Sequence, residues 1–137
     1  MATVAINGLG RIGRATLKIV METPGLDLVA VNELAAPGEI VYLLKYDTVY
    51  GRYNHSVATA DGALVVGGHR LALLHEKNPA VLPWRSLDVD IVLECTGAFA
   101  RRNDLLKHVQ AGAKYVILTG SHTCGNVVTH DFSPAVA

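Results

Sequence analysis

Three glycines near the amino terminus have the spacing of a phosphate-binding turn. They are Gly8, Gly10 and Gly13 in the segment AINGLGRIGRA, between a run of β-branched residues and a segment with helical periodicity. In such a strand-to-helix turn the first glycine permits a sharp bend, the second lets a phosphate approach the backbone, and the third lets the helix pack against the strand. The backbone N–H groups of the first helical turn then face the anion. The pattern predicts a dinucleotide site, with a glycine-rich turn that binds nothing as the alternative.

A carboxylate follows these glycines at the distance expected for a ribose-binding residue. Glu33 lies about twenty residues after Gly13, at the end of the second predicted strand. A carboxylate there accepts hydrogen bonds from the adenosine ribose hydroxyls and repels a 2′-phosphate. Residues 34–36 are Leu-Ala-Ala, so no Arg or Lys is present at these positions to attract that phosphate. The combination favours NAD over NADP, and a solvated loop charge at Glu33 is the alternative.

Two further strand ends carry groups that could complete the site. Cys95-Thr96-Gly97 lies at the end of the strand DIVLEC, and Thr119-Gly120 follows the strand KYVIL. In a doubly wound sheet the first of these faces the glycine turn across the crevice where the strand order reverses. Thr96 and Gly97 are therefore predicted to contact the pyrophosphate or the nicotinamide-side ribose, and Thr119 could do likewise. For either segment ordinary loop is the alternative. Cys95 ends a buried strand and is predicted to be a small core residue.

The elements that must position these residues alternate between strand and helix. Apolar runs predict buried parallel strands over residues 3–6, 28–31, 90–95 and 114–118, and helical periodicity predicts helices over 11–23, 38–47 and 101–111. In the first helix the residues expected to share one face are Ile12, Thr16, Ile19 and Val20.

The segment between the second predicted helix and the third predicted parallel strand has a different pattern of residues. HSVATADGALVVGGHRLALLHE alternates and contains Asp61-Gly62 and Gly67-Gly68, which predicts an antiparallel meander of about three strands with tight turns. The predicted fold class is therefore α/β, a Rossmann-type doubly wound, mostly parallel sheet with an inserted antiparallel meander. Residues 1–118 are predicted to form an NAD-binding domain, and residues 119–137 a divergent tail in which NVVT could form one further strand.

Composition limits the partners and the compartment. Of the 137 residues half are hydrophobic, and twelve Lys and Arg balance twelve Asp and Glu, so the formal net charge is zero. Neither a nucleic-acid partner nor a membrane partner is therefore expected. The two cysteines make no disulfide framework, and no leader or membrane-spanning run is recognised. A cytoplasmic protein is predicted.

With these pieces in place, the sequence resembles the coenzyme-binding domain of the glyceraldehyde-3-phosphate dehydrogenase family. AINGLGRIGR, VNELA, LLKYDTVYGRY, VLECTGAF and GAKYVIL match that family's motifs in order and spacing, over about residues 3–118. VNELA, together with LLHEKNPAVLPWRSLDVD, is most similar to the erythrose-4-phosphate dehydrogenase branch or a bacterial relative. The resemblance implies an NAD-dependent dehydrogenase of phosphorylated aldehydes that is normally a homotetramer.

The resemblance also implies roles for particular residues. In that family the residues lining the cofactor would be Asn7, Gly8, Gly10, Arg11, Ile12, Glu33, Thr96 and Gly97. Lys77 stands near the position that meets the adenine, and Thr119 takes a position usually held by Ser near the nicotinamide ribose. Tyr46 and the YGRY segment would lie near a subunit contact.

The tail departs from the family pattern. Family members continue to the motif SCTTN, whose cysteine attacks the aldehyde, and then to a substrate domain, and neither follows in these 137 residues. Cys124 lies near His122 and His130, but a working nucleophile or a zinc site there is not expected, since no bound substrate orients the pair and the spacing matches no common zinc pattern. The sequence predicts a fragment that binds NAD and has no catalytic residue and no metal. The alternative is a truncated paralogue acting as a nucleotide-binding or subunit-interaction module.

Overall fold

A computed structural model describes residues 1–47, 51–96, 102–119 and 128–131. Its helices are α1 (Arg11–Met21), α2 (Pro37–Lys45) and α3 (Arg102–Gln110), with a short 3-10 helix, η1, at Pro79–Val81. Its strands are β1 (Ala2–Asn7), β2 (Leu26–Asn32), β3 (Tyr46–Asp47), β4 (Gly51–Arg52), β5 (Val57–Ala60), β6 (Ala63–Val66), β7 (His69–Leu74), β8 (Ile91–Glu94), β9 (Tyr115–Leu118) and β10 (Val128–Asp131).

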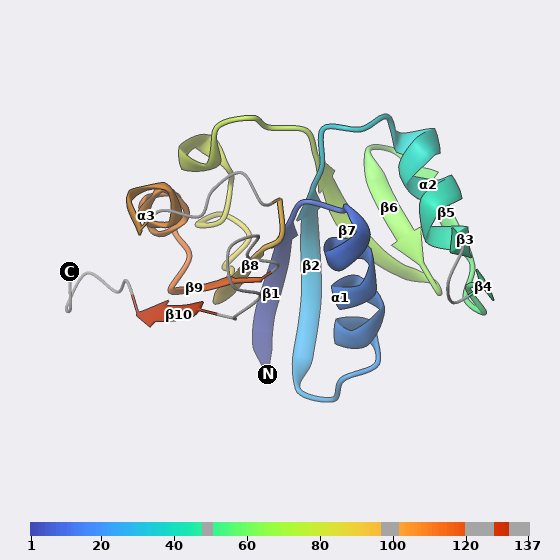
Figure 1. The fold of residues 1–137 in the computed structure, drawn as a ribbon, viewed down its shortest axis with the longest axis horizontal. Helices are drawn as coiled ribbons and strands as arrows, with labels where there is room; N and C mark the ends of the chain where they lie inside the picture. The colour runs from blue at the N-terminus through green and yellow to red at the C-terminus, as the bar shows by residue number, and fades with distance from the viewer. Residues whose placement is uncertain (48–50, 97–101, 120–127, 132–137) are drawn as a thin grey trace.

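One mixed sheet forms the centre of the molecule (Figure 1). Its strand order is β10-β9-β8-β1-β2-β7-β6-β5, and the strands from β9 to β7 run parallel. The chain moves from β1 through α1 to β2 on one side, and β8 later pairs with β1 on the other side. This reversal of winding at β1 creates the topological switch point at which open α/β sheets bind ligands. The predicted Rossmann-type α/β class is confirmed.

The two faces of the sheet are covered by different elements. Along β1, Val4 and Ile6 pack with Leu17 of α1, whereas Ala5 points to the opposite face and packs in the cluster that holds Trp84. This alternation follows from the two-residue period of a strand. On the second face α3 packs through Leu105 against β9. A strand buried on both faces explains the nearly continuous apolar run at the start of the chain.

Of the residues predicted to share one face of α1, Val20 is buried but Ile12 and Ile19 are not. Ile12 and Ile19 are 47% and 66% exposed, and the buried residues are Gly13, Leu17 and Val20. A Cβ added at Gly13 would lie 1.9 Å from the carbonyl oxygen of Gly8. The residue without a side chain must therefore face the turn, and this contact sets the rotation of the whole helix.

The helix predicted over residues 38–47 also ends earlier than expected. α2 stops at Lys45, because Tyr46 adopts an extended conformation and the Lys45 carbonyl accepts from the backbone N–H of Tyr53. Tyr46 and Asp47 instead form β3, which pairs antiparallel with β4.

The meander is confirmed as β5, β6 and β7, which pair antiparallel in sequence order. Its two turns have positive φ at both central residues, Asp61-Gly62 and Gly67-Gly68, as two-residue hairpin loops require. β7 then pairs parallel with β2, so the meander extends the sheet.

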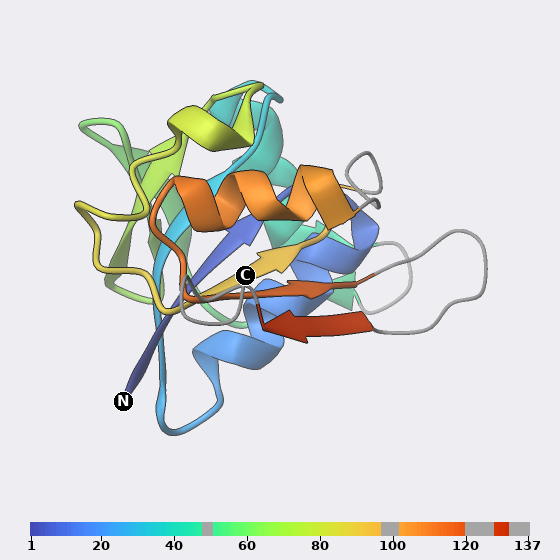
Figure 2. The same ribbon diagram turned by 90° about the vertical axis from the view of Figure 1, so that its left-hand side faces the viewer.

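At the opposite edge β10 runs antiparallel to β9 (Figure 2). β10 overlaps the predicted strand NVVT but begins and ends two residues later in the chain. The domain boundary at Leu118 stays a prediction. None of the helices in the described part of the chain has the length and apolar character that would let it cross a membrane.

Candidate dinucleotide site

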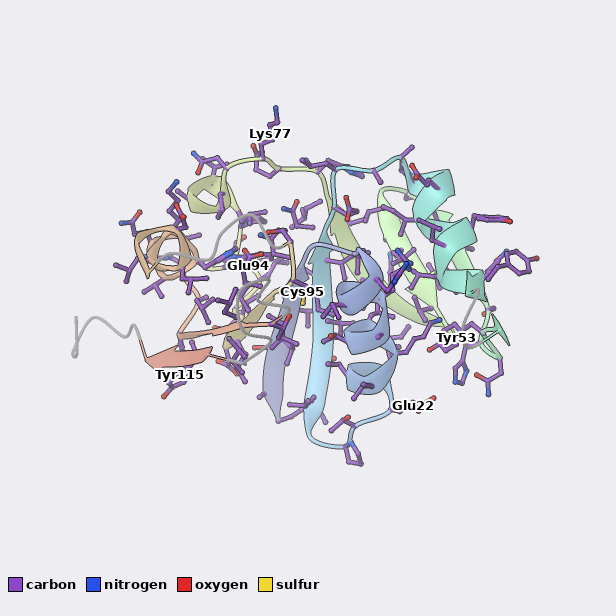
Figure 3. The ribbon with its side chains drawn as sticks, in the orientation of Figure 1. Glu22, Tyr53, Lys77, Glu94, Cys95 and Tyr115 are labelled. Carbon is purple, nitrogen blue, oxygen red and sulfur yellow. The ribbon has the colours of Figure 1, made fainter. Side chains whose placement is uncertain are left out.

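A cavity of about 520 Å³ opens at the carboxyl ends of the central strands. This volume lies in the range of small-molecule and cofactor sites. Six of the residues predicted from the sequence line it: Asn7, Gly8, Gly10, Glu33, Lys77 and Thr96. Four more complete its wall and were not predicted as site residues: Asn32, Leu34, Glu76 and Cys95. Figure 3 shows Lys77 projecting from the top edge of the molecule, while Glu94 and Cys95 lie near its middle.

The three glycines of the turn meet three different steric demands. Gly8 has φ of 98°, and a Cβ there would lie 2.7 Å from Cγ2 of Thr96, so the turn touches the end of β8. Gly13 packs against the Gly8 carbonyl. Gly10, in contrast, has φ of −70°, and no atom of the described residues lies within 4 Å of the Cβ that an alanine would carry. Since Gly10 borders the cavity, its missing side chain leaves room for a ligand.

The amino terminus of α1 presents an anion-binding surface. No side chain among the described residues caps the helix at Gly10, and its first turn contains no acidic residue. The first N–H groups of a helix have no intrahelical acceptor, and the helix dipole places partial positive charge there. An uncapped helix end beside an open glycine suits a pyrophosphate, so the residues present fit a dinucleotide.

The Glu33 carboxylate is fixed in the cavity wall by two backbone groups. Oε1 accepts from the N–H of Leu9 at 2.8 Å, and Oε2 accepts from the N–H of Ala35 at 2.9 Å. The first bond joins the end of β2 to the glycine turn itself. A carboxylate has about four acceptor positions, so two remain for a ligand.

Three other predicted residues, Arg11, Ile12 and Thr119, are not in this cavity wall. Arg11 and Ile12 are exposed on the first turn of α1. Thr119 lies behind the wall, with its Oγ1 2.8 Å from Cys95 Sγ. Gly97, His122 and Cys124 fall outside the described residues, as does the side chain of His130. Among the residues that the structure describes, no group of three or more His, Cys, Asp or Glu could hold a metal.

A buried polar cluster beneath the cavity was not predicted. Glu94 and His108 have no exposed side-chain surface, and His108 Nε2 lies 2.8 Å from Glu94 Oε1. Asn7 Nδ2 donates to the same oxygen at 2.7 Å. The signal in the sequence was a carboxylate inside the apolar strand DIVLEC, because a buried carboxylate must find several donors. The partners could not be found from spacing, since Asn7 lies on β1, 87 residues away, and His108 lies on a different element, α3, 14 residues away.

Cys95 is expected to react slowly with alkylating reagents. Burial raises the pKa of its thiol, the nearby charge of Glu94 acts in the same direction, and the hydrogen bond with Thr119 opposes both. Since the thiolate is the reactive form, iodoacetamide at about pH 7.5 should modify Cys95 at least about tenfold more slowly than in the urea-unfolded chain. Peptide mass mapping separates Cys95 from Cys124. Equal rates in the folded and unfolded chain would contradict the burial argument.

Comparison with known proteins agrees with this geometry. The model of the family "Glyceraldehyde 3-phosphate dehydrogenase, NAD binding domain" matches residues 2–102. The chain is 43% identical over 124 residues to glyceraldehyde-3-phosphate dehydrogenase 2 of Staphylococcus aureus strain Mu50, covering 90% of this chain and 36% of that relative. It is 44% identical over 119 residues to glyceraldehyde-3-phosphate dehydrogenase of Clostridium acetobutylicum, covering 87% of this chain and 36% of that relative.

The chain thus spans about a third of the length of these curated relatives. The matched region contains the glycine turn, Glu33 and the end of β8, which are the parts that form the cavity. The chain therefore belongs to the glyceraldehyde-3-phosphate dehydrogenase family, and it contains that family's NAD-binding domain.

Proposed function

We propose that this chain binds NAD in the cavity at the switch point as the coenzyme domain of a phosphorylated-aldehyde dehydrogenase, and that the 137 residues alone do not oxidise the aldehyde. The observation that carries the proposal is the hydrogen bond from the Leu9 N–H to Glu33 Oε1 at 2.8 Å. It brings the phosphate-binding turn and the ribose-binding carboxylate together on one cavity wall. NAD, when bound, supplies a hydride acceptor.

In our proposal, different residues of this chain bind different parts of the cofactor. The turn from Gly8 to Ile12 and the amino terminus of α1 bind the pyrophosphate, and Glu33 binds the adenosine ribose. Lys77, at the rim, lies toward the adenine. On the nicotinamide side we place Thr96 with Gly97 and Thr119, and Asn7 supports the floor between the two halves.

The activity of the whole enzyme is a further part of the proposal. Relatives named glyceraldehyde-3-phosphate dehydrogenase favour that aldehyde as the substrate. We also propose a place in glycolysis. The motifs VNELA and LLHEKNPAVLPWRSLDVD leave erythrose-4-phosphate as the second candidate. We also propose that the protein works in the cytoplasm and assembles as a homo-oligomer.

Binding of NAD to the isolated chain is expected to be weak. The cavity opens to solvent, and we expect the longer family members to cover the cofactor with further residues. We expect a dissociation constant above about 10 μM, which corresponds to less than about 7 kcal/mol of binding free energy. Titration calorimetry on folded protein tests this. No binding at millimolar NAD would refute the proposal, and if the same chain joined oligomers of a full-length relative, the interaction-module alternative would replace it.

Glu33→Ala is expected to narrow the preference for NAD over NADP. The substitution removes both an acceptor for the ribose hydroxyl and a negative charge near the 2′ position. We expect the ratio of the two dissociation constants to change by about tenfold, or roughly 1.4 kcal/mol. Glu22→Ala is the matched control, because Glu22 is an exposed glutamate at the opposite end of α1 (Figure 3). An unchanged ratio in Glu33→Ala would exclude the proposed role.

A further inference from the structure

The Glu94 carboxylate accepts hydrogen bonds from four donors in the interior. Oε1 accepts from Asn7 Nδ2 at 2.7 Å and from His108 Nε2 at 2.8 Å. Oε2 accepts from the backbone N–H of Thr96 at 3.0 Å and from its hydroxyl at 2.8 Å. The side chain has no exposed surface. Two of its three partners, Asn7 and Thr96, line the cavity.

The direction of the bond from His108 is fixed by a tryptophan. Trp84 Nε1 lies 3.0 Å from His108 Nδ1, and an indole N–H can only donate. Nδ1 must therefore be an acceptor, which leaves the ring proton on Nε2, directed at Glu94. His108 is thus the neutral tautomer that donates to the carboxylate, and Glu94 is stabilised by hydrogen bonds without a formal positive charge on His108.

The direction of the bond from Asn7 is fixed from the other side of the cavity. The backbone N–H of Glu76 donates to Asn32 Oδ1 at 2.8 Å, which turns Asn32 Nδ2 toward Asn7 Oδ1 at 2.7 Å. Asn7 must then direct its Nδ2 at Glu94. The N–H groups of Glu76, Trp84 and Thr96 can only donate. They therefore fix the donor and acceptor directions of a hydrogen-bond network that ends on Glu94. Only a group that accepts at both oxygens satisfies it.

We propose that Glu94 is a positioning residue for dinucleotide binding, one that fixes Asn7 and Thr96 in the cavity and couples them to His108 and Trp84. The inference rests on the proposed NAD function. Through Asn7 and Asn32 the network also holds Glu76, so a single buried carboxylate sets the relative position of the walls contributed by β1, β2, β8 and the segment after β7.

Glutamine at position 94 has nearly the shape of glutamate but cannot complete this network. If its NH₂ takes the place of Oε2, it meets the backbone N–H of Thr96. If its NH₂ takes the place of Oε1, it meets the donors of Asn7 and His108, whose directions are already set. Either orientation leaves a buried donor without an acceptor, which the side chains relieve by moving Asn7 or Thr96 out of position.

The test compares Glu94→Gln with Glu22→Gln, the same chemical change at an exposed site far from the cavity. NAD affinity is measured by calorimetry well below the unfolding temperature of each variant, with ellipticity as the check on folding. We expect at least about tenfold weaker binding for Glu94→Gln and wild-type affinity for Glu22→Gln. A folded Glu94→Gln variant with wild-type affinity overturns the inference and leaves the proposed NAD function intact. A wild-type chain that binds no NAD overturns both.

A spectroscopic signal separates positioning from a general loss of stability. The chain contains one tryptophan, so the indole N–H of Trp84 gives a single resonance. NAD should shift this resonance in the wild type and in Glu22→Gln but not in Glu94→Gln, even at concentrations that saturate the variant. A response in Glu94→Gln equal to that of the wild type contradicts the coupling.

A second variant applies if Glu94→Gln does not fold. Trp84→Phe keeps an aromatic ring in the core but removes the indole N–H. The tautomer of His108 is then no longer fixed by a donor at Nδ1. Trp84 is fully buried and is not among the residues that line the cavity. We expect about threefold weaker NAD binding, and wild-type affinity in folded Trp84→Phe overturns the inference.

Discussion

Replacing Gly10 with alanine is expected to leave the domain folded and to weaken NAD binding at least about a hundredfold, or roughly 2.7 kcal/mol. The backbone at Gly10 has φ of −70°, which alanine adopts without strain, and in the part of the chain that the structure describes no atom lies within 4 Å of the added methyl group. That methyl group would instead occupy the space through which a phosphate approaches the helix terminus. Urea unfolding and calorimetry measure the two effects separately.

Gly13→Ala is the matched comparison, and for this variant we expect the main effect on stability rather than on NAD binding. Its Cβ would lie 1.9 Å from the Gly8 carbonyl oxygen, a backbone atom that cannot rotate away. Helix α1 would have to move off β1, which should cost more than about 4 kcal/mol of a total stability of about 5–15 kcal/mol. If Gly10→Ala binds NAD as well as the wild type, or if Gly13→Ala unfolds at the wild-type urea concentration, the assigned roles of the two glycines are wrong.

A protein of these 137 residues is expected to produce no NADH from glyceraldehyde-3-phosphate or erythrose-4-phosphate. Aldehyde oxidation of this family's kind requires a positioned thiolate, a base, a pocket for the substrate phosphate and exclusion of water. In the described part of the chain the one cysteine, Cys95, is buried, and burial raises the pKa of its thiol. Without a bound substrate the proximity effect, worth about 7–11 kcal/mol in well-oriented cases, is lost.

The assay measures NADH formation with and without phosphate, using protein freed of host dehydrogenases. Cys124→Ser and Cys95→Ser are assayed beside the wild type. Activity that disappears in Cys124→Ser would show that the segment SHTCGN replaces the family's catalytic motif. Activity that disappears only in Cys95→Ser would show that the buried thiol becomes accessible. Activity that persists in both variants would indicate a contaminating full-length enzyme.

The parallel strands, the meander and the glycine turn could be predicted because their signals are local. A strand buried on both faces needs a continuous apolar run, and a two-residue hairpin needs residues that tolerate positive φ, as at Asp61-Gly62. The cavity lining could be predicted in part for the same reason. Gly8, Gly10 and Glu33 occupy set positions after strands, and the winding of the sheet brings strand ends together.

The rotation of α1 could not be predicted from its own periodicity. Ile12 and Ile19 gave the helix a second apolar stripe, and periodicity alone does not say which stripe faces the sheet. The close approach of Gly13 to the Gly8 carbonyl decides it, because only a residue without Cβ fits there.

The sequence by itself predicted the fold class, the glycine turn and the NAD cofactor, because each prediction depends on residue types at short, fixed spacing. Only the tertiary structure decided which polar groups support that turn. Glu94 meets Asn7, which lies 87 residues away in the chain, and His108, whose tautomer is set by Trp84. A buried carboxylate needs donors in the three-dimensional positions where its lone pairs point, and the packing of strands and helices supplies those positions.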